Sequence, residues 1–178
     1  MAGPKPLRVA DLQQNTPTGF DLRPGTELME ALKQELGLQG LRKLSFTGHV
    51  QAHGKRDWVL TGKLGATVIQ PCVITLDPVT TRIDIPVRRV FLAEWDEPDE
   101  PEFEMPEDDE TEPMGEEIDP YQVMVEALSL ALPQYPRKKD AEVEQTGYTE
   151  PGKRAMTDED AKPFAGLAEL RDALKKDE

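Results

Sequence analysis

The alternation of apolar and polar residues predicts three consecutive strands. In residues 44–52, Leu44, Phe46 and Val50 occupy one set of alternate positions, and mainly polar residues occupy the other. The same period of two returns in residues 57–70, after a turn at 53–56, and again in residues 79–95, after the Asp77-Pro78 turn. A period of two is typical of strands that bury one face against a core. We therefore expect an antiparallel sheet built from hairpins.

Three residues in these strands predict irregularity. Gly62 and Gly65 indicate a bend or bulge in the second strand, because glycine weakens a regular strand. Pro86 has no N–H to give to a neighbour, so the third strand should be an edge strand or be broken there.

A first helix is expected after Pro24-Gly25. Thr26 is a suitable N-cap residue, Leu28, Leu32 and Leu36 recur at steps of four, and Gly37 is a suitable end.

A second helix is expected over residues 119–132. Asp119 is a suitable N-cap, Pro120 fits the first helical position, Gln122 fits the third position of a capping box, and Pro133 stops the helix. This helix is apolar nearly all round, which predicts that it lies across the sheet and is heavily buried.

These elements predict an α+β fold. We expect an antiparallel sheet, barrel-like or strongly twisted, packed against one or two helices, with a disordered acidic insert. The predicted organisation is an extended segment at 1–23, a single domain at 24–135 that includes the insert at 94–118, a flexible linker at 136–162, and a short helix at 163–178. That last helix either packs on the domain or binds a partner.

Charge is concentrated in one segment. Residues 94–119 contain fifteen carboxylates and no lysine, arginine or histidine, so the formal net charge of -14 becomes about +1 (-14 + 15) for the rest of the chain. Repulsion among carboxylates and four prolines argue against a packed structure here. The insert is either a solvated loop or a polyanion that attracts a cationic partner. The candidate residues for such a contact are Asp96, Glu97, Asp99, Glu100, Glu107, Asp108, Asp109 and Glu110.

Basic residues on the strands suggest a second kind of contact. Lys63, Arg82, Arg88 and Arg89 are expected at exposed sheet positions, where they could bind RNA phosphates. The alternative is an ordinary solvated surface, since the chain lacks an aromatic stacking platform. A further hypothesis is that the insert folds back onto these arginines.

Catalytic and metal-binding motifs are missing from the sequence. A single cysteine, Cys72, excludes an internal disulfide and a multi-cysteine zinc site. The two histidines, His49 and His53, are interpreted as ordinary surface residues. We expect no enzymatic activity, cofactor, metal or small-molecule substrate. With no secretory signal and no apolar run long enough for a bilayer, a cytoplasmic location without membrane partners is expected.

The order of motifs resembles the YceD family, the large-ribosomal-RNA-subunit accumulation proteins of bacteria and plastids. The resemblance covers residues 40–175 and depends on Cys72 to Pro78, on Asp119 to Pro133, and on the Pro163-Phe164-Ala165 piece. The family pattern places a second cysteine where Thr75 stands here, so a metal or redox role for the family's cysteines is not carried over. The residues matching family motifs, taken as structural, are Cys72, Asp119, Glu126, Leu130, Pro133 and Phe164.

The resemblance implies a non-enzymatic role in the synthesis, processing or accumulation of large-subunit ribosomal RNA. The partner would be a basic ribosomal protein, immature rRNA, or both. Two alternatives stay open: a protein-interaction module unrelated to ribosomes, and a metal-dependent RNA-processing enzyme. The enzyme is disfavoured because carboxylates in a proline-rich segment are poorly held for metal binding.

Overall fold

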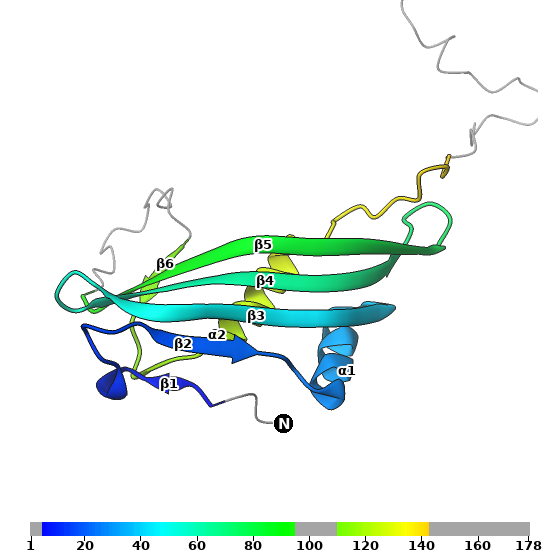
Figure 1. Cartoon of the computed structure of the whole chain (residues 1–178). Helices are drawn as coiled ribbons and strands as arrows, with labels where there is room; N and C mark the ends of the chain where they lie inside the picture. Colours follow the sequence, from blue (N-terminus) through cyan, green and yellow to red (C-terminus); the bar gives the residue numbers. More distant parts are fainter. Residues whose placement is uncertain (1–4, 95–109, 143–178) are drawn as a thin grey trace, which may run out of the picture. The chain divides into compact units, whose positions relative to one another are not determined.

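The fold is built on one five-stranded sheet (Figure 1). The computed structural model describes residues 5–94 and 110–142. The spatial order is β2-β3-β4-β5-β6, and every neighbouring pair is antiparallel except β5 and β6, which are parallel. The strands are β2 (Thr18–Leu22), β3 (Gly40–His53), β4 (Asp57–Pro71), β5 (Pro78–Leu92) and β6 (Thr111–Pro113).

The α+β class and the mainly antiparallel sheet are confirmed, and the barrel is wrong. The sheet stays open because β2 and β6 lie at its two ends and do not pair with each other. A separate antiparallel pair joins β1 (Leu7–Arg8) to β7 (Glu117–Ile118). A short 3-10 turn, Val9–Asp11, follows β1.

Two glycines in β4 allow side chains to pack closely against the strand. A Cβ at position 62 would lie 2.7 Å from Cε2 of Phe46, so the missing side chain makes room for this buried ring. A Cβ at position 65 would lie 2.7 Å from Nη2 of Arg82. The bulge that was expected in β4 lies instead in β3, between Arg42 and Ser45, where Lys43 has a φ of 52°.

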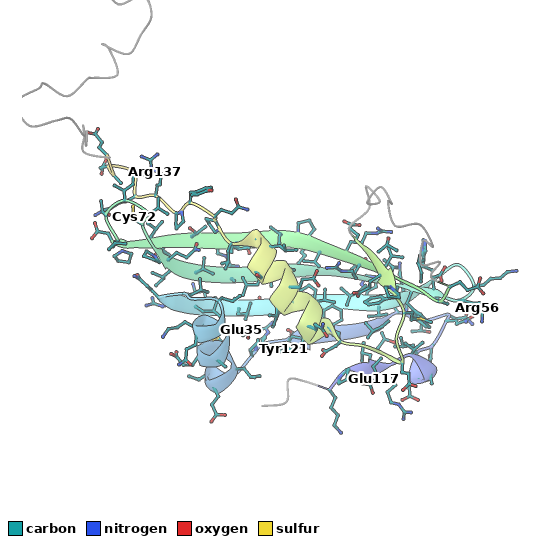
Figure 2. The ribbon with its side chains drawn as sticks, turned by 180° about the vertical axis from the view of Figure 1, so that it is seen from behind. Glu35, Arg56, Cys72, Glu117, Tyr121 and Arg137 are labelled. Atoms are coloured by element: carbon teal, nitrogen blue, oxygen red, sulfur yellow. The ribbon has the colours of Figure 1, made fainter. Side chains whose placement is uncertain are left out.

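Helix α2 (Pro120–Ala131) crosses one face of the sheet, as Figure 2 shows. Its N-cap is the predicted Asp119, whose Oδ1 accepts a hydrogen bond from the Tyr121 N–H at 2.9 Å. Met124 and Leu128 are fully buried against the strands. The expected heavy burial holds for the side of α2 that faces the sheet, but not for Leu130, whose side chain is 78% exposed.

Helix α1 (Thr26–Glu35) begins one residue earlier in its cap than expected. Gly25 holds the N-cap position, so Thr26 is the first helical residue and caps nothing with its side chain. The end is as predicted: Gly37 has a φ of 63°, and the N–H groups of Gly37 and Leu38 donate back to Gln34 and Lys33. This pair of bonds forms a Schellman motif.

The core lies between α2 and the inward face of the sheet. Burying each large apolar side chain stabilises the fold by about 1.5–3 kcal/mol. Phe20 and Phe46 pack with ring centroids 5.0 Å apart. Among the described residues, no helix has the length and apolar character required to span a membrane. The largest fully buried side chains include Phe46, Leu60, Leu64, Ile118, Met124 and Leu128.

Candidate binding surfaces beside the acidic insert

The sheet face opposite α2 is the one seen in front in Figure 1, and we call it the open face. Lys63 pairs with Thr47 and Pro86 across the strands, and Arg82 donates to Thr67 on the same face at 3.4 Å. The open face therefore brings together three of the four basic residues predicted as RNA contacts: Lys63, Arg82 and Arg88.

Carboxylates already bind two of these cations. Arg82 forms an ion pair with Asp84, and Nη1 of Arg88 lies 2.7 Å from Oε2 of Glu110. The Arg82–Asp84 pair lowers the pKa of Asp84, mainly through its hydrogen bonds. Within the described part of the chain, Lys63 has no ion pair in this structure. The positive charge that the open face can offer to a phosphate is thus mostly offset.

Arg89 is not at an exposed position, so this part of the prediction is wrong. Neighbouring strand residues point to opposite faces, and Arg88 takes the open face. Arg89 therefore points toward α2, where its side chain is only 12% exposed and its Nη2 lies 2.8 Å from Oε1 of Glu126. The family-motif residue Glu126 thus ties α2 to β5.

Glu112, from β6, completes a charged cluster around Arg89. Burial raises the pKa of Glu112, while the positive charge of Arg89 lowers it and the negative charge of Glu126 raises it further. A cavity of about 170 Å³ beside the cluster is lined by further carboxylates, including Glu117 and Asp119. The C-terminal end of the insert thus forms an acidic surface next to α2.

Glu94 and Glu110, the described residues of the acidic insert that flank its undescribed part, are both bound to arginines. Glu94 forms an ion pair with Arg56 at the tip of the β3–β4 hairpin, and Glu110 pairs with Arg88. Of the eight candidate carboxylates, Asp96, Glu97, Asp99, Glu100, Glu107, Asp108 and Asp109 lie outside the described residues, and only Glu110 lies within them.

Cys72 is a buried thiol that accepts hydrogen bonds from backbone donors. The Lys138 N–H lies 3.5 Å from Sγ, and this bond, together with donors at Thr75 and Ile74, lowers the Cys72 pKa to about 6. The side chain is fully buried. Nζ of Lys138 also lies 3.0 Å from Oδ2 of Asp77, which lowers the pKa of Asp77. The cysteine thereby anchors the chain after α2 to the β4–β5 turn.

The remaining family-motif residues have structural surroundings or fall outside the description. The C=O of Pro133 accepts a hydrogen bond from Nε2 of Gln70 at 3.2 Å. Phe164 and the helix predicted at 163–178 lie outside the described residues, as does the linker beyond residue 142. Among the residues that are described, no group of three or more His, Cys, Asp and Glu side chains could hold a metal ion.

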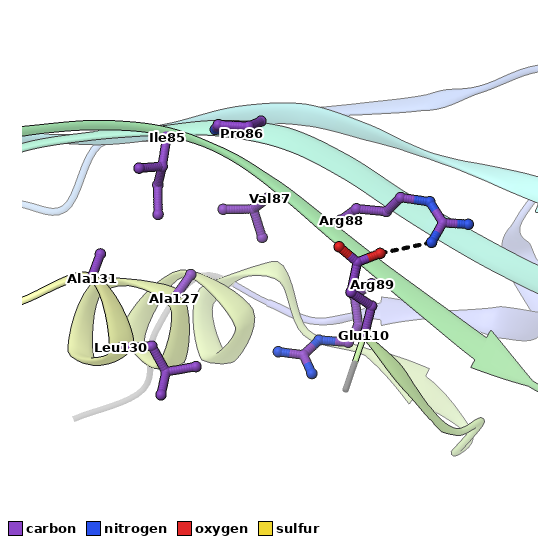
Figure 3. Close-up of a pocket in the computed structure, with 9 residues that line it drawn as sticks. All are labelled: Ile85, Pro86, Val87, Arg88, Arg89, Glu110, Ala127, Leu130 and Ala131. Atoms are coloured by element: carbon purple, nitrogen blue, oxygen red, sulfur yellow. Dashed lines mark hydrogen bonds and ion pairs between the residues drawn. The ribbon is translucent and has the colours of Figure 1, made fainter. Parts of the chain in front are cut away.

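Sequence reasoning missed a groove between β5 and α2. Its volume is about 390 Å³, and Ile85, Val87, Ala127 and Leu130 are among its lining residues (Figure 3). The Arg88–Glu110 ion pair lies at one end of it. Two features of the sequence could have indicated it: Pro86, which has no N–H to donate to a neighbouring strand, and the apolar Leu130 on an otherwise polar side of α2.

These features define a class of small α+β protein with an open sheet face and an acidic surface beside one helix. The family model described as large ribosomal RNA subunit accumulation protein YceD matches residues 60–171, which is 112 of the 178 residues. The chain belongs to this family. Neither the curated proteins nor the solved structures contain a match to it.

Proposed function

We propose that the protein is a non-enzymatic factor that supports accumulation of large-subunit ribosomal RNA by binding a basic ribosomal protein through its acidic insert. The family name supports the process. The observation that favours a basic protein as the partner is the distribution of charged residues. The insert at 94–118 concentrates fourteen carboxylates, whereas Arg82, Arg88 and Arg89 are each bound to a carboxylate.

Physical chemistry supports this mode of action. A concentrated polyanion attracts a cationic protein over a distance comparable to the Debye length, about 8 Å at physiological salt, and speeds its encounter. Contacts made by charge alone are displaced by a competing polyanion, so rRNA phosphates can replace the insert when the ribosomal protein reaches its assembly site. No step in this cycle requires a bond to be made or broken. The cycle would take place in the cytoplasm.

The test compares two variants that carry the same change in charge. One replaces Asp96, Glu97, Asp99, Glu100, Glu107, Asp108 and Asp109 with the matching amides and leaves Glu110 on Arg88. The control replaces seven carboxylates of the C-terminal segment with amides: Asp158, Glu159, Asp160, Glu169, Asp172, Asp177 and Glu178.

The probe is total protein extracted from large ribosomal subunits, applied to each immobilised protein at low salt and at about 0.5 M salt, where exposed charges are largely screened. Wild type and the control should retain basic proteins at low salt, and the insert variant should not. Equal retention by both variants would refute a role for the insert.

Direct contact with precursor rRNA is the second candidate. Its support is the presence of Lys63, Arg82 and Arg88 on one uncovered sheet face. Binding of precursor rRNA that is lost in Lys63→Gln, and strengthened in Glu110→Gln because Arg88 is released, would favour this candidate. The same variants should leave retention of ribosomal protein nearly unchanged.

A further inference from the structure

On the side of β5 that faces away from β4, only the last residues of the strand pair with another described strand. Its last residues pair with β6, where the Val90 N–H donates to the Glu110 C=O and the Leu92 C=O accepts from the Met114 N–H, both at 2.8 Å. Backbone groups of a strand alternate in direction, so even-numbered residues of β5 direct their N–H and C=O groups away from β4. Within the described residues, no strand pairs with this edge from Pro78 to Arg89.

The groove between β5 and α2 lies along this edge. Ile85 and Val87 extend toward α2 in Figure 3, and Ala127 and Ala131 face them from the helix. Leu130, also in the lining, is 78% exposed. An extended segment beside β5 would therefore gain backbone hydrogen bonds from the edge and bury every second side chain against an apolar lining, as in strand addition.

The charged residues around the groove indicate what kind of segment it would bind. Arg88, Arg89 and Glu110 line the groove at one end. Glu126 forms an ion pair with Arg89, and Glu112 interacts electrostatically with both, so three glutamates surround two arginines there. The second described part of the chain, which begins at Glu110 of the acidic insert, starts at the same place. A basic segment is favoured there. A second copy of this chain is disfavoured by the net charge of -14, because two copies of like charge repel each other.

We propose that the β5 edge and the groove beside α2 bind an extended, basic peptide segment with apolar side chains at alternate positions. This inference rests on the proposed function, since it places part of the same basic partner on the folded body. The insert attracts the partner, and the β5 edge then holds one segment of it in a defined register. Pro86 restricts that register, because it has no N–H to donate and the bound segment therefore cannot place a C=O group that needs a hydrogen bond opposite it.

The test uses amide hydrogen exchange resolved by residue in the full chain. The probe is a synthetic peptide of alternating valine and lysine, about twelve residues long to cover the edge. The outward amides of Asp84 and Arg88 should exchange quickly in the free protein and become at least about tenfold slower with the peptide. The inward amides of Ile85 and Val87 should be slow in both states. A peptide of alternating valine and glutamate should give no such slowing.

Two variants with matched side chains check the groove. Leu130→Lys adds a positive charge to the lining and should weaken the peptide's affinity about tenfold. Leu76→Lys changes an equally exposed leucine (73%, at the β4–β5 turn) and should leave the affinity unchanged. Both positions are exposed, so both variants should fold.

Three results would overturn the inference. The first is peptide binding without slowing at Asp84 and Arg88. The second is equal effects of the two lysine substitutions. The third is slow exchange of the outward amides in the free protein that becomes fast on deletion of residues 95–109, since the chain would then cover its own edge. Retention of ribosomal protein by the insert alongside any of these results would leave the proposed function intact.

Discussion

Replacing Gly62 with alanine should destabilise the fold, although the substitution adds a single methyl group. The new Cβ would lie 2.7 Å from Cε2 and 3.1 Å from Cζ of Phe46, and 3.0 Å from the Thr47 C=O. The Phe46 ring is fully buried, so it cannot turn out into solvent without losing its packing. Overpacking of this kind costs about 1–3 kcal/mol, and the loss of unfolded-state freedom from Gly to Ala returns about 0.4–1 kcal/mol.

The expected net loss is about 1–2 kcal/mol of unfolding free energy, or a fall in Tm of roughly 3–8 °C for a body of this size. Urea and thermal unfolding measure it directly. Gly19→Ala is the matched control, because the nearest atom to its added Cβ is the Gly48 C=O at 3.8 Å, an ordinary contact. Its stability should stay within about 0.5 kcal/mol of wild type.

A double-mutant cycle identifies the cause. In a Phe46→Leu background the smaller side chain leaves room for the new methyl group, so Gly62→Ala should cost less than about 0.5 kcal/mol there. If Gly62→Ala were as stable as Gly19→Ala, or if its cost were the same in both backgrounds, the close packing of Phe46 over position 62 would not be the reason for this glycine.

Three further predictions concern α2 and the cluster beside it. Leu128→Asp buries an unpaired charge at a fully buried position and should unfold the domain; a urea midpoint equal to that of wild type would contradict this. Asp119→Ala should cost about 1 kcal/mol in urea unfolding and Asp119→Asn much less, because both Asp and Asn can accept from the Tyr121 N–H. Glu112→Gln should stabilise the protein at pH 7: the raised pKa of Glu112 makes its ionised form costly in the folded state, and this cost disappears as pH falls below the ordinary value of 4.5. If the difference in unfolding free energy between Glu112→Gln and wild type were the same at pH 4 and pH 7, the raised pKa of Glu112 would not be its cause.

Local patterns predicted the regular elements well. The period of two located β3, β4 and β5, and the Asp119-Pro120 start and the Pro133 stop bounded α2. The edge-strand prediction from Pro86 holds only locally: β5 lies between β4 and β6, but its pairing with β6 covers Val90 to Leu92, and Pro86 pairs with β4 alone among the described strands. These features depend on residues that are close together in the chain, which is why they could be predicted from the sequence.

Features that depend on residues far apart in the chain were not predictable in the same way. The parallel pairing of β6 with β5 joins segments separated by the insert, and no period reveals it. The alternation within β5 could have shown that Arg88 and Arg89 point to opposite faces, but the partner of Arg89, Glu126, comes from another element. The groove beside β5 needs both α2 and the strand edge, so only the folded chain defines it.

The central claim is that the carboxylates of the insert support large-subunit rRNA accumulation. The most direct test measures the ratio of large-subunit to small-subunit rRNA in cells that lack this protein and are complemented with one variant at equal abundance. Wild type and the seven-amide variant of the C-terminal segment should restore the ratio, and the seven-amide variant of the insert should not. Full restoration by the insert variant would contradict the claim.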